Sequence, residues 1–80
     1  MNLYAQAIDI PREVLKEYYK QLQSHDYKVS RTPRGAEVLI GITINGVRSE
    51  IMGVLTQGDS PEALIEVMKG EIEKIINGKN

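Results

Sequence analysis

The tetrapeptide Ile44-Asn45-Gly46-Val47 constrains the fold of this chain more than any other local feature. Asn-Gly readily adopts the two positive φ angles of a type I′ turn, whose twist matches that of two antiparallel strands. A two-residue turn also fixes the strand register, because Ile44 must then lie opposite Val47. The sequence therefore predicts a β-hairpin with strands near residues 36–44 and 47–55.

Side chains alternate between the two faces of this hairpin, and one face is much more apolar than the other. We expect the apolar face to be the core, and it carries the pairs Ile44–Val47, Ile42–Ser49, Ile40–Ile51 and Val38–Gly53. The other face is mixed, with the pairs Thr43–Arg48, Gly41–Glu50, Leu39–Met52 and Glu37–Val54. Leu39, Met52 and Val54 therefore lie on a face for which the chain supplies no covering layer, and such patches often mark interfaces.

A third strand near residues 27–31 precedes the hairpin, and two registers are open to it. A three-residue loop would bury Lys28, whereas a four-residue loop pairs Arg31 with Ala36 and buries Tyr27 and Val29. Burial of an unpaired ammonium group costs several kcal/mol in order of magnitude, so we expect the four-residue loop.

The segment before the sheet has the spacing of a helix. Apolar side chains in residues 11–24 form one stripe, Pro11 suits the first turn, and Asp9 is a candidate cap. Residues 1–9 are expected to form an arm or an additional edge strand, because residues 2–8 alternate weakly.

The segment after the sheet predicts a second helix over residues 60–77. It starts at Ser60-Pro61-Glu62 and ends at Asn77-Gly78. The chain of 80 residues is therefore expected to be one α+β domain with the order helix, three-stranded antiparallel meander, helix (αβββα) over residues 11–78. The predicted core comprises Leu15, Tyr18, Leu22, Val29, Val38, Ile40, Ile42, Ile51, Leu64, Met68, Ile72 and Ile75.

The residues that could carry chemistry are few. There is no cysteine, and the single histidine, His25, lies beside Asp26 at the predicted exit of the first helix, where a solvated side chain is expected. No metal-ligand spacing or phosphate-binding glycine pattern is present. We therefore expect no enzyme activity, no metal and no cofactor. The lack of cysteines, of a leader and of a long apolar run favours a cytoplasmic protein without a membrane partner.

Charge is unevenly distributed, although ten Lys and Arg residues nearly balance eleven Asp and Glu residues. Residues 27–36 contain only basic charges, and residues 59–74 are mainly acidic. A nucleic-acid-binding domain that uses Lys28, Arg34 and Arg48 is therefore an alternative function. The tyrosines do not favour a base-stacking platform, since at least Tyr18 and Tyr27 are predicted to lie in the core.

The order of the predicted elements resembles that of the double-stranded RNA-binding domain. The stretch Asp26-Tyr27-Lys28-Val29-Ser30-Arg31 followed by Gly35-Ala36-Glu37 is also similar to HicA-type toxin ribonucleases, with Ala36 where those toxins have a catalytic histidine. Certain phage anti-CRISPR inhibitors share this order too. That last resemblance implies an inhibitor of an RNA-guided nuclease complex.

The function expected from these observations is a non-enzymatic protein-interaction module, such as an inhibitor or adaptor of a phage or mobile element. Its contact surface is expected to combine the mixed sheet face with the acidic second helix. The candidate partner-binding residues are Leu39, Met52, Val54, Arg48, Glu50, Glu62 and Glu66. A homodimer is also expected, formed by stacking of the mixed faces or by pairing of edge strands, with residues 1–8 as a candidate exchanged segment.

Overall fold

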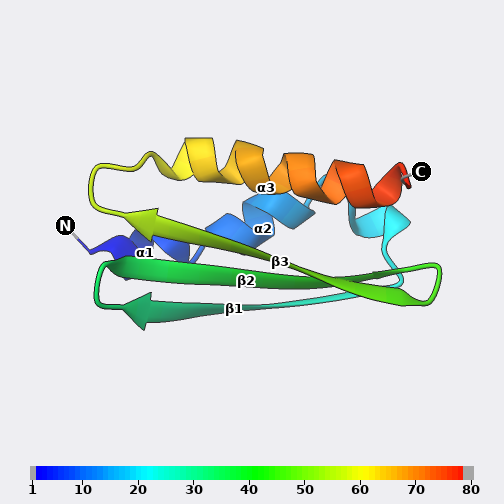
Figure 1. Ribbon diagram of the computed structural model, residues 1–80, viewed down its shortest axis with the longest axis horizontal. Helices are drawn as coiled ribbons and strands as arrows, with labels where there is room; N and C mark the ends of the chain where they lie inside the picture. The colour runs from blue at the N-terminus through cyan, green and yellow to red at the C-terminus, as the bar shows by residue number, and fades with distance from the viewer. Residues whose placement is uncertain (1, 79–80) are drawn as a thin grey trace.

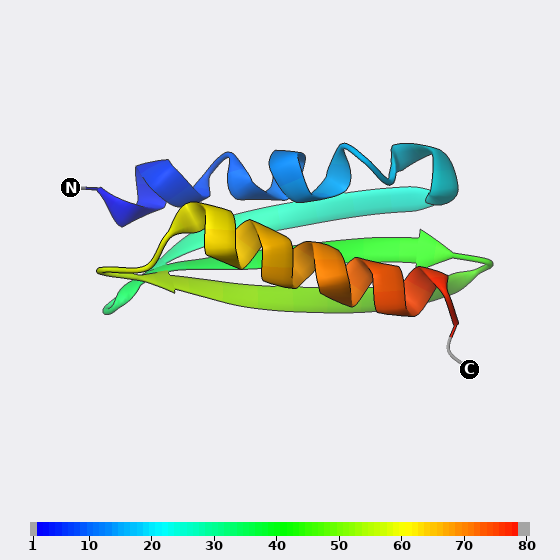
Figure 2. The same cartoon turned by 90° about the horizontal axis from the view of Figure 1, so that it is seen from above.

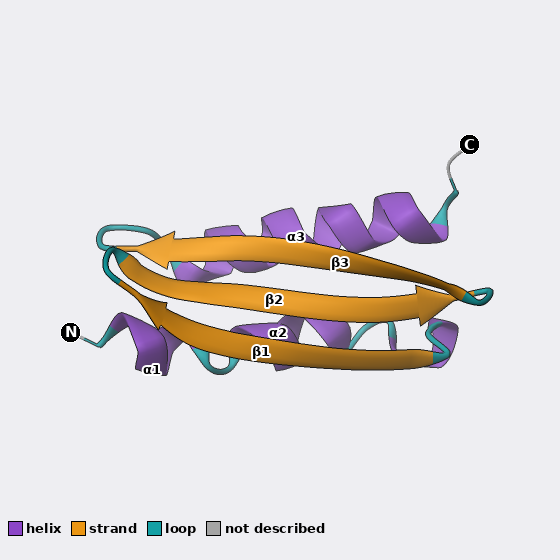
Figure 3. Cartoon of the chain, turned by 60° about the horizontal axis from the view of Figure 1, so that its bottom comes forward, coloured by secondary structure: helices purple, strands orange, loops and turns teal. Residues whose placement is uncertain are grey.

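The computed structural model describes residues 2–78 and confirms the predicted α+β architecture. Three antiparallel strands form one sheet in the order β1-β2-β3, and all helices lie on one side of it (Figure 1). The opposite side of the sheet is uncovered (Figure 3). The elements are α1 (Leu3–Ala7), α2 (Ile10–Leu15), the 3-10 helix η1 (Tyr19–Gln21), β1 (Ser24–Thr32), β2 (Gly35–Ile44), β3 (Val47–Thr56) and α3 (Pro61–Ile76).

The hairpin of β2 and β3 has the predicted register. Ile44 lies opposite Val47, and the pairing continues without a bulge from there to Gly35 opposite Thr56. Asn45 and Gly46 have φ angles of 52° and 80°, as a type I′ turn requires. The turn chemistry of two residues thus sets the two faces of both strands.

The predicted register of β1 is also confirmed, because Arg31 lies opposite Ala36 and Lys28 lies on the uncovered face. The pairing extends one step further, to Thr32 opposite Gly35, and the Thr32 hydroxyl accepts a hydrogen bond of 3.1 Å from the Gly35 N–H. β1 also begins earlier than residue 27, at Ser24. The cost of burying Lys28 therefore predicted the correct arrangement.

The prediction of an edge strand near the N-terminus is wrong, since residues 3–7 form the helix α1. The Asn2 side chain caps this helix by accepting a hydrogen bond of 3.2 Å from the Ala5 N–H. Pro11 explains why the helix ends where it does, because proline lacks the N–H that would bond to the Ala7 carbonyl. A new short helix, α2, starts at Ile10 instead. Met1 lies outside the described residues.

The prediction of one continuous helix over residues 11–24 is wrong as well. α2 ends at Leu15, and the chain continues in tighter turns, with Tyr18 N–H donating to the Leu15 carbonyl at 2.8 Å. A 3-10 turn follows before β1 begins. Tyr18 nevertheless stays buried and Leu22 packs against the core, so the apolar stripe keeps its place although the helix is interrupted.

The core lies between the sheet and the layer of helices, in which the N-terminal helices run beside α3 (Figure 2). Most of the predicted core is buried, and Leu22, Val29, Leu64 and Ile75 are partly buried against it. The predicted burial of Tyr27 is wrong, because its side chain is 49% exposed on the edge strand β1. Val47, on the same side of the sheet, is also exposed, since it lies at the hairpin tip. The predictions missed the buried residues Ala7, Ile10, Val14, Ala36 and Leu55.

The helix α3 agrees with its prediction, and polar contacts hold both its start and its side facing the N-terminal helices. The Ser60 side chain caps it by accepting a 3.3 Å hydrogen bond from the Ala63 N–H. On the side of the N-terminal helices, Lys69 Nζ lies 2.7 Å from Glu17 Oε2. That hydrogen bond raises the pKa of Lys69 and lowers the pKa of Glu17.

Candidate functional site

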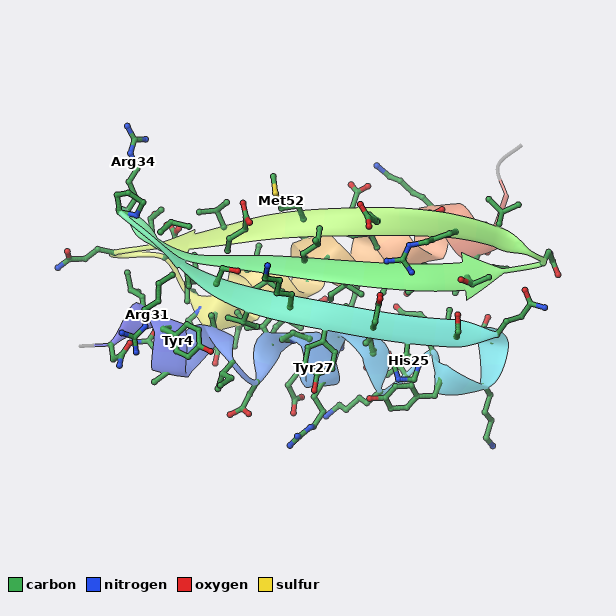
Figure 4. All side chains as sticks on the ribbon, turned by 90° about the horizontal axis from the view of Figure 1, so that it is seen from below. Tyr4, His25, Tyr27, Arg31, Arg34 and Met52 are labelled. Atoms are coloured by element: carbon green, nitrogen blue, oxygen red, sulfur yellow. The ribbon has the colours of Figure 1, made fainter. Side chains whose placement is uncertain are left out.

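The uncovered sheet face carries the apolar residues that the sequence indicated. Met52 is 60% exposed, Val54 is 43% exposed, and Leu39 lies beside them on the central strand with partial exposure. Figure 4 shows the Met52 side chain pointing away from the sheet. The sheet thus presents an apolar centre that nothing in residues 2–78 covers.

An ion-pair network borders this apolar centre. Arg48 Nη2 lies 3.2 Å from Asp26 Oδ1 and 3.3 Å from Glu50 Oε2, so the guanidinium joins the two outer strands across β2. These two hydrogen bonds raise the pKa of Arg48. Gly41 lies beneath the guanidinium, where a Cβ atom would collide with it. A shallow groove of about 200 Å³ runs beside the network, lined by Asp26, Tyr27, Lys28, Leu39, Gly41 and Arg48.

The structure divides the set of predicted partner-binding residues. Arg48 and Glu50 lie with Leu39, Met52 and Val54 on the uncovered face. Glu62 and Glu66 are exposed on α3, which packs against the opposite face of the sheet. One flat partner surface therefore cannot contact both groups. We define the open face by the first group alone: Leu39, Arg48, Glu50, Met52 and Val54.

An apolar surface that was not predicted lies at the outer edge of β3. A groove of about 190 Å³ separates β3 from α3 and is lined by Val54, Asp59, Ser60, Ala63, Leu64 and Val67. Val67 is 62% exposed. The sequence did contain a signal for this surface. Val67 is the one branched apolar residue of α3 that lies outside the apolar stripe facing the core.

The cations proposed for nucleic-acid binding are not gathered in one place. Arg48 is held by two carboxylates, Lys28 lies in the middle of β1, and Arg34 lies at the tip of the β1–β2 turn (Figure 4). Arg31 is not among the three predicted cations, and its guanidinium carbon lies 4.9 Å from the centre of the Tyr4 ring. In residues 2–78 no carboxylate forms an ion pair with Lys28, Arg31 or Arg34.

His25 is not at a helix end, contrary to the prediction. It lies in β1 opposite Ile42, and its ring centre is 4.8 Å from that of Tyr19. The described part of the chain holds no cluster of three or more side chains suited to a metal ion. Among the helices of residues 2–78, none has the length and apolar character needed to cross a membrane.

Comparison with known proteins attaches no family to this chain. No protein-family model matches the chain, and neither a curated protein nor a solved structure matches it. The αβββα order is shown by the structure alone.

Proposed function

We propose that this chain is a non-enzymatic protein-binding module that contacts its partner through the open face. The observation that carries the proposal is the exposed apolar centre of Leu39, Met52 and Val54. Protein interfaces commonly combine such a centre with a polar rim. The network of Arg48 with Asp26 and Glu50 supplies a rim of this kind.

The specific role that we propose is inhibitor or adaptor, similar in element order to the phage anti-CRISPR proteins. A nuclease complex is then the first partner to test. A flat sheet face with an apolar centre suits a role in which the protein blocks or bridges other surfaces, since such a role requires contact area and no reactive group. Glu62 and Glu66 lie outside the proposed contact surface.

Affinity capture with a matched pair of variants tests this proposal. Leu39→Glu places a carboxylate in the centre of the open face, and Val47→Glu places the same group at the exposed hairpin tip. Wild type and Val47→Glu are expected to retain the same partner from the source lysate, and Leu39→Glu is expected to lose it. The proposal fails if no retained protein depends on position 39 while all three proteins remain folded by circular dichroism.

A second candidate function is the binding of single-stranded nucleic acid along β1. The specific observation is the exposure of Tyr27, which makes this ring available for base stacking although Tyr18 is buried. Tyr4, Tyr27 and Arg31 lie along the same edge of the sheet (Figure 4). Base stacking on tyrosine combined with unpaired cations is the usual basis of sequence-tolerant single-strand binding.

Salt dependence distinguishes the two candidates. If the β1 edge binds a labelled single-stranded RNA oligonucleotide, the Kd measured by fluorescence anisotropy rises steeply with salt. Both Arg31→Ala and Tyr27→Ala then weaken binding, whereas Leu39→Glu does not. A Kd that is independent of salt, or unchanged in both variants, excludes this candidate.

A further inference from the structure

The outer edge of β3 has unpaired backbone groups. In a hairpin with a two-residue turn, the residues that flank the turn exchange hydrogen bonds, and every second pair after them does the same. Val47, Ser49, Ile51, Gly53 and Leu55 therefore bond to β2. The N–H and C=O groups of the residues between them face outward, and nothing in residues 2–78 bonds to those of Arg48, Glu50, Met52 or Val54.

This outward ladder has a defined end at Thr56. The Thr56 N–H donates to Asp59 Oδ2 at 2.9 Å, and its carbonyl accepts from the Asp59 N–H at 3.0 Å. These bonds hold the turn that leads into α3. The pairing edge is therefore confined to residues 48–54. The last three residues with outward-facing backbone groups are Glu50, Met52 and Val54.

The two edges of the sheet differ in character. The centre of β1 carries the charged residues Asp26, Lys28 and Arg31, and charges on an edge strand oppose pairing with another strand. The C-terminal half of β3, Ile51-Met52-Gly53-Val54-Leu55, carries no charge, and the two charged residues of the strand, Arg48 and Glu50, lie before it. Apolar residues also border this edge on both sides, with Met52 and Val54 on the open face and Val67 on α3. An added strand would lie beside all three side chains.

The edge is complementary to itself, which favours a second copy of this chain as the added strand. A twofold axis at Met52 places the two Met52 residues side by side and brings Glu50 opposite Val54 of the second copy. A shift that centres the axis at Glu50 would instead oppose two carboxylates, which is unfavourable. The antiparallel α3 helices also complement each other, since Lys74 in the last turn of one helix is then directed toward the first turn of the other, which contains Glu62.

We propose that two copies pair antiparallel through β3, centred on Met52, so that two three-stranded sheets form one continuous sheet. The α3 helices then meet through Val67. This assignment selects edge pairing over stacking of the open faces. It goes beyond the proposed function and does not depend on it, because pairing at the edge extends the sheet in its own plane and leaves the open face uncovered.

Two variants test the dimer, and the lack of native cysteine makes one of them a clean probe. We expect sedimentation equilibrium to show a wild-type dimer at about 100 μM protein, with a Kd of about 10 μM or lower. Val67→Glu should raise this Kd at least about 100-fold by bringing two carboxylates together in a desolvated contact. Leu39→Glu, the variant that abolishes capture of the partner under the proposed function, should leave the Kd unchanged.

Oxidative cross-linking reports the register. Opposed residues in a hydrogen-bonded antiparallel pair have Cα atoms about 5.5 Å apart, a separation that a disulfide spans. Met52→Cys should therefore form a disulfide-linked dimer under mild oxidation, and Thr43→Cys on the central strand should not. A monomeric wild type, a dimer insensitive to Val67→Glu, or a Met52→Cys protein that does not cross-link would each overturn the proposal. If the wild-type protein dimerises but captures no partner, the proposed function fails and the dimer proposal stands.

Discussion

The guanidinium of Arg48 lies over Gly41, in the space that a Cβ atom at position 41 would fill. The missing side chain lets Arg48 cross the central strand and reach Asp26 on β1 at 3.2 Å. The ion pair therefore lies flat against the sheet. The apolar centre of the open face remains accessible to a partner as a result.

The two buried strand glycines should respond differently to alanine. A Cβ atom at Gly53 would meet Leu64 and Met68 of α3 in the core, so Gly53→Ala should cost about 1–3 kcal/mol of unfolding free energy. A Cβ atom at Gly41 meets the mobile ends of Arg48 and Asp26, which can move into solvent. Gly41→Ala should therefore cost less than about 1 kcal/mol. Urea denaturation measures both, and a larger cost at Gly41 would contradict the packing described here.

Neighbouring residues of β2 test the assignment of the two faces. Ile40 is fully buried, so Ile40→Ala should lower the unfolding free energy by about 2–5 kcal/mol. Leu39 lies on the open face, so Leu39→Ala should cost less than about 1 kcal/mol. The comparison is made by chemical denaturation at neutral pH. A reversed order would mean that the faces are exchanged.

Tyr18 should make the stability of the protein fall at alkaline pH. Its buried hydroxyl donates a 2.7 Å hydrogen bond to Glu73 Oε2, and burial together with this bond raises the pKa of Tyr18 to about 12. Because the folded-state pKa exceeds the ordinary value of 10.0, the contribution is complete below pH 10 and is lost as the pH rises toward 12. The loss should amount to at most about 3 kcal/mol.

Unfolding measured between about pH 9 and about pH 12 on wild type and Tyr18→Phe isolates this effect. The variant lacks the hydroxyl, so the difference in stability between the two proteins should shrink as the pH rises. A difference that stays constant over this range would show that Tyr18 ionises as readily in the folded protein as in the unfolded chain.

The sheet could be predicted because its hairpin turn and its strand register each depend on only a few residues. Asn45-Gly46 set the hairpin, and the cost of burying Lys28 set the register of β1. The broken N-terminal helix was harder to predict. Pro11 explains the break after α1, but residues 12–23 contain neither glycine nor proline to signal the end of α2. The contacts of this segment are tertiary, such as the hydrogen bond between Tyr18 and Glu73, and cannot be inferred from neighbouring residues.

The candidate site was predictable only as far as strand alternation could assign faces. Alternation placed Leu39, Met52 and Val54 correctly on the open face. It could not show whether helices cover a given position, and Tyr27 is therefore exposed although it points to the core side. Nor could it show that Val67 of α3 lines the same groove as Val54, because that arrangement depends on how the helix docks against the sheet.

The methyl resonance of Met52 tests most directly whether the open face is the contact surface. Met52 is 60% exposed, and Met68, which is 1% exposed in the core, is an internal control in the same spectrum. Protein labelled with ¹³C at the methionine methyl groups is mixed with the purified partner from the capture experiment, at a fixed concentration of labelled chain. We predict that the Met52 signal shifts or broadens in proportion to the bound fraction while the Met68 signal stays in place. A partner that binds without changing the Met52 signal would contradict the proposed function.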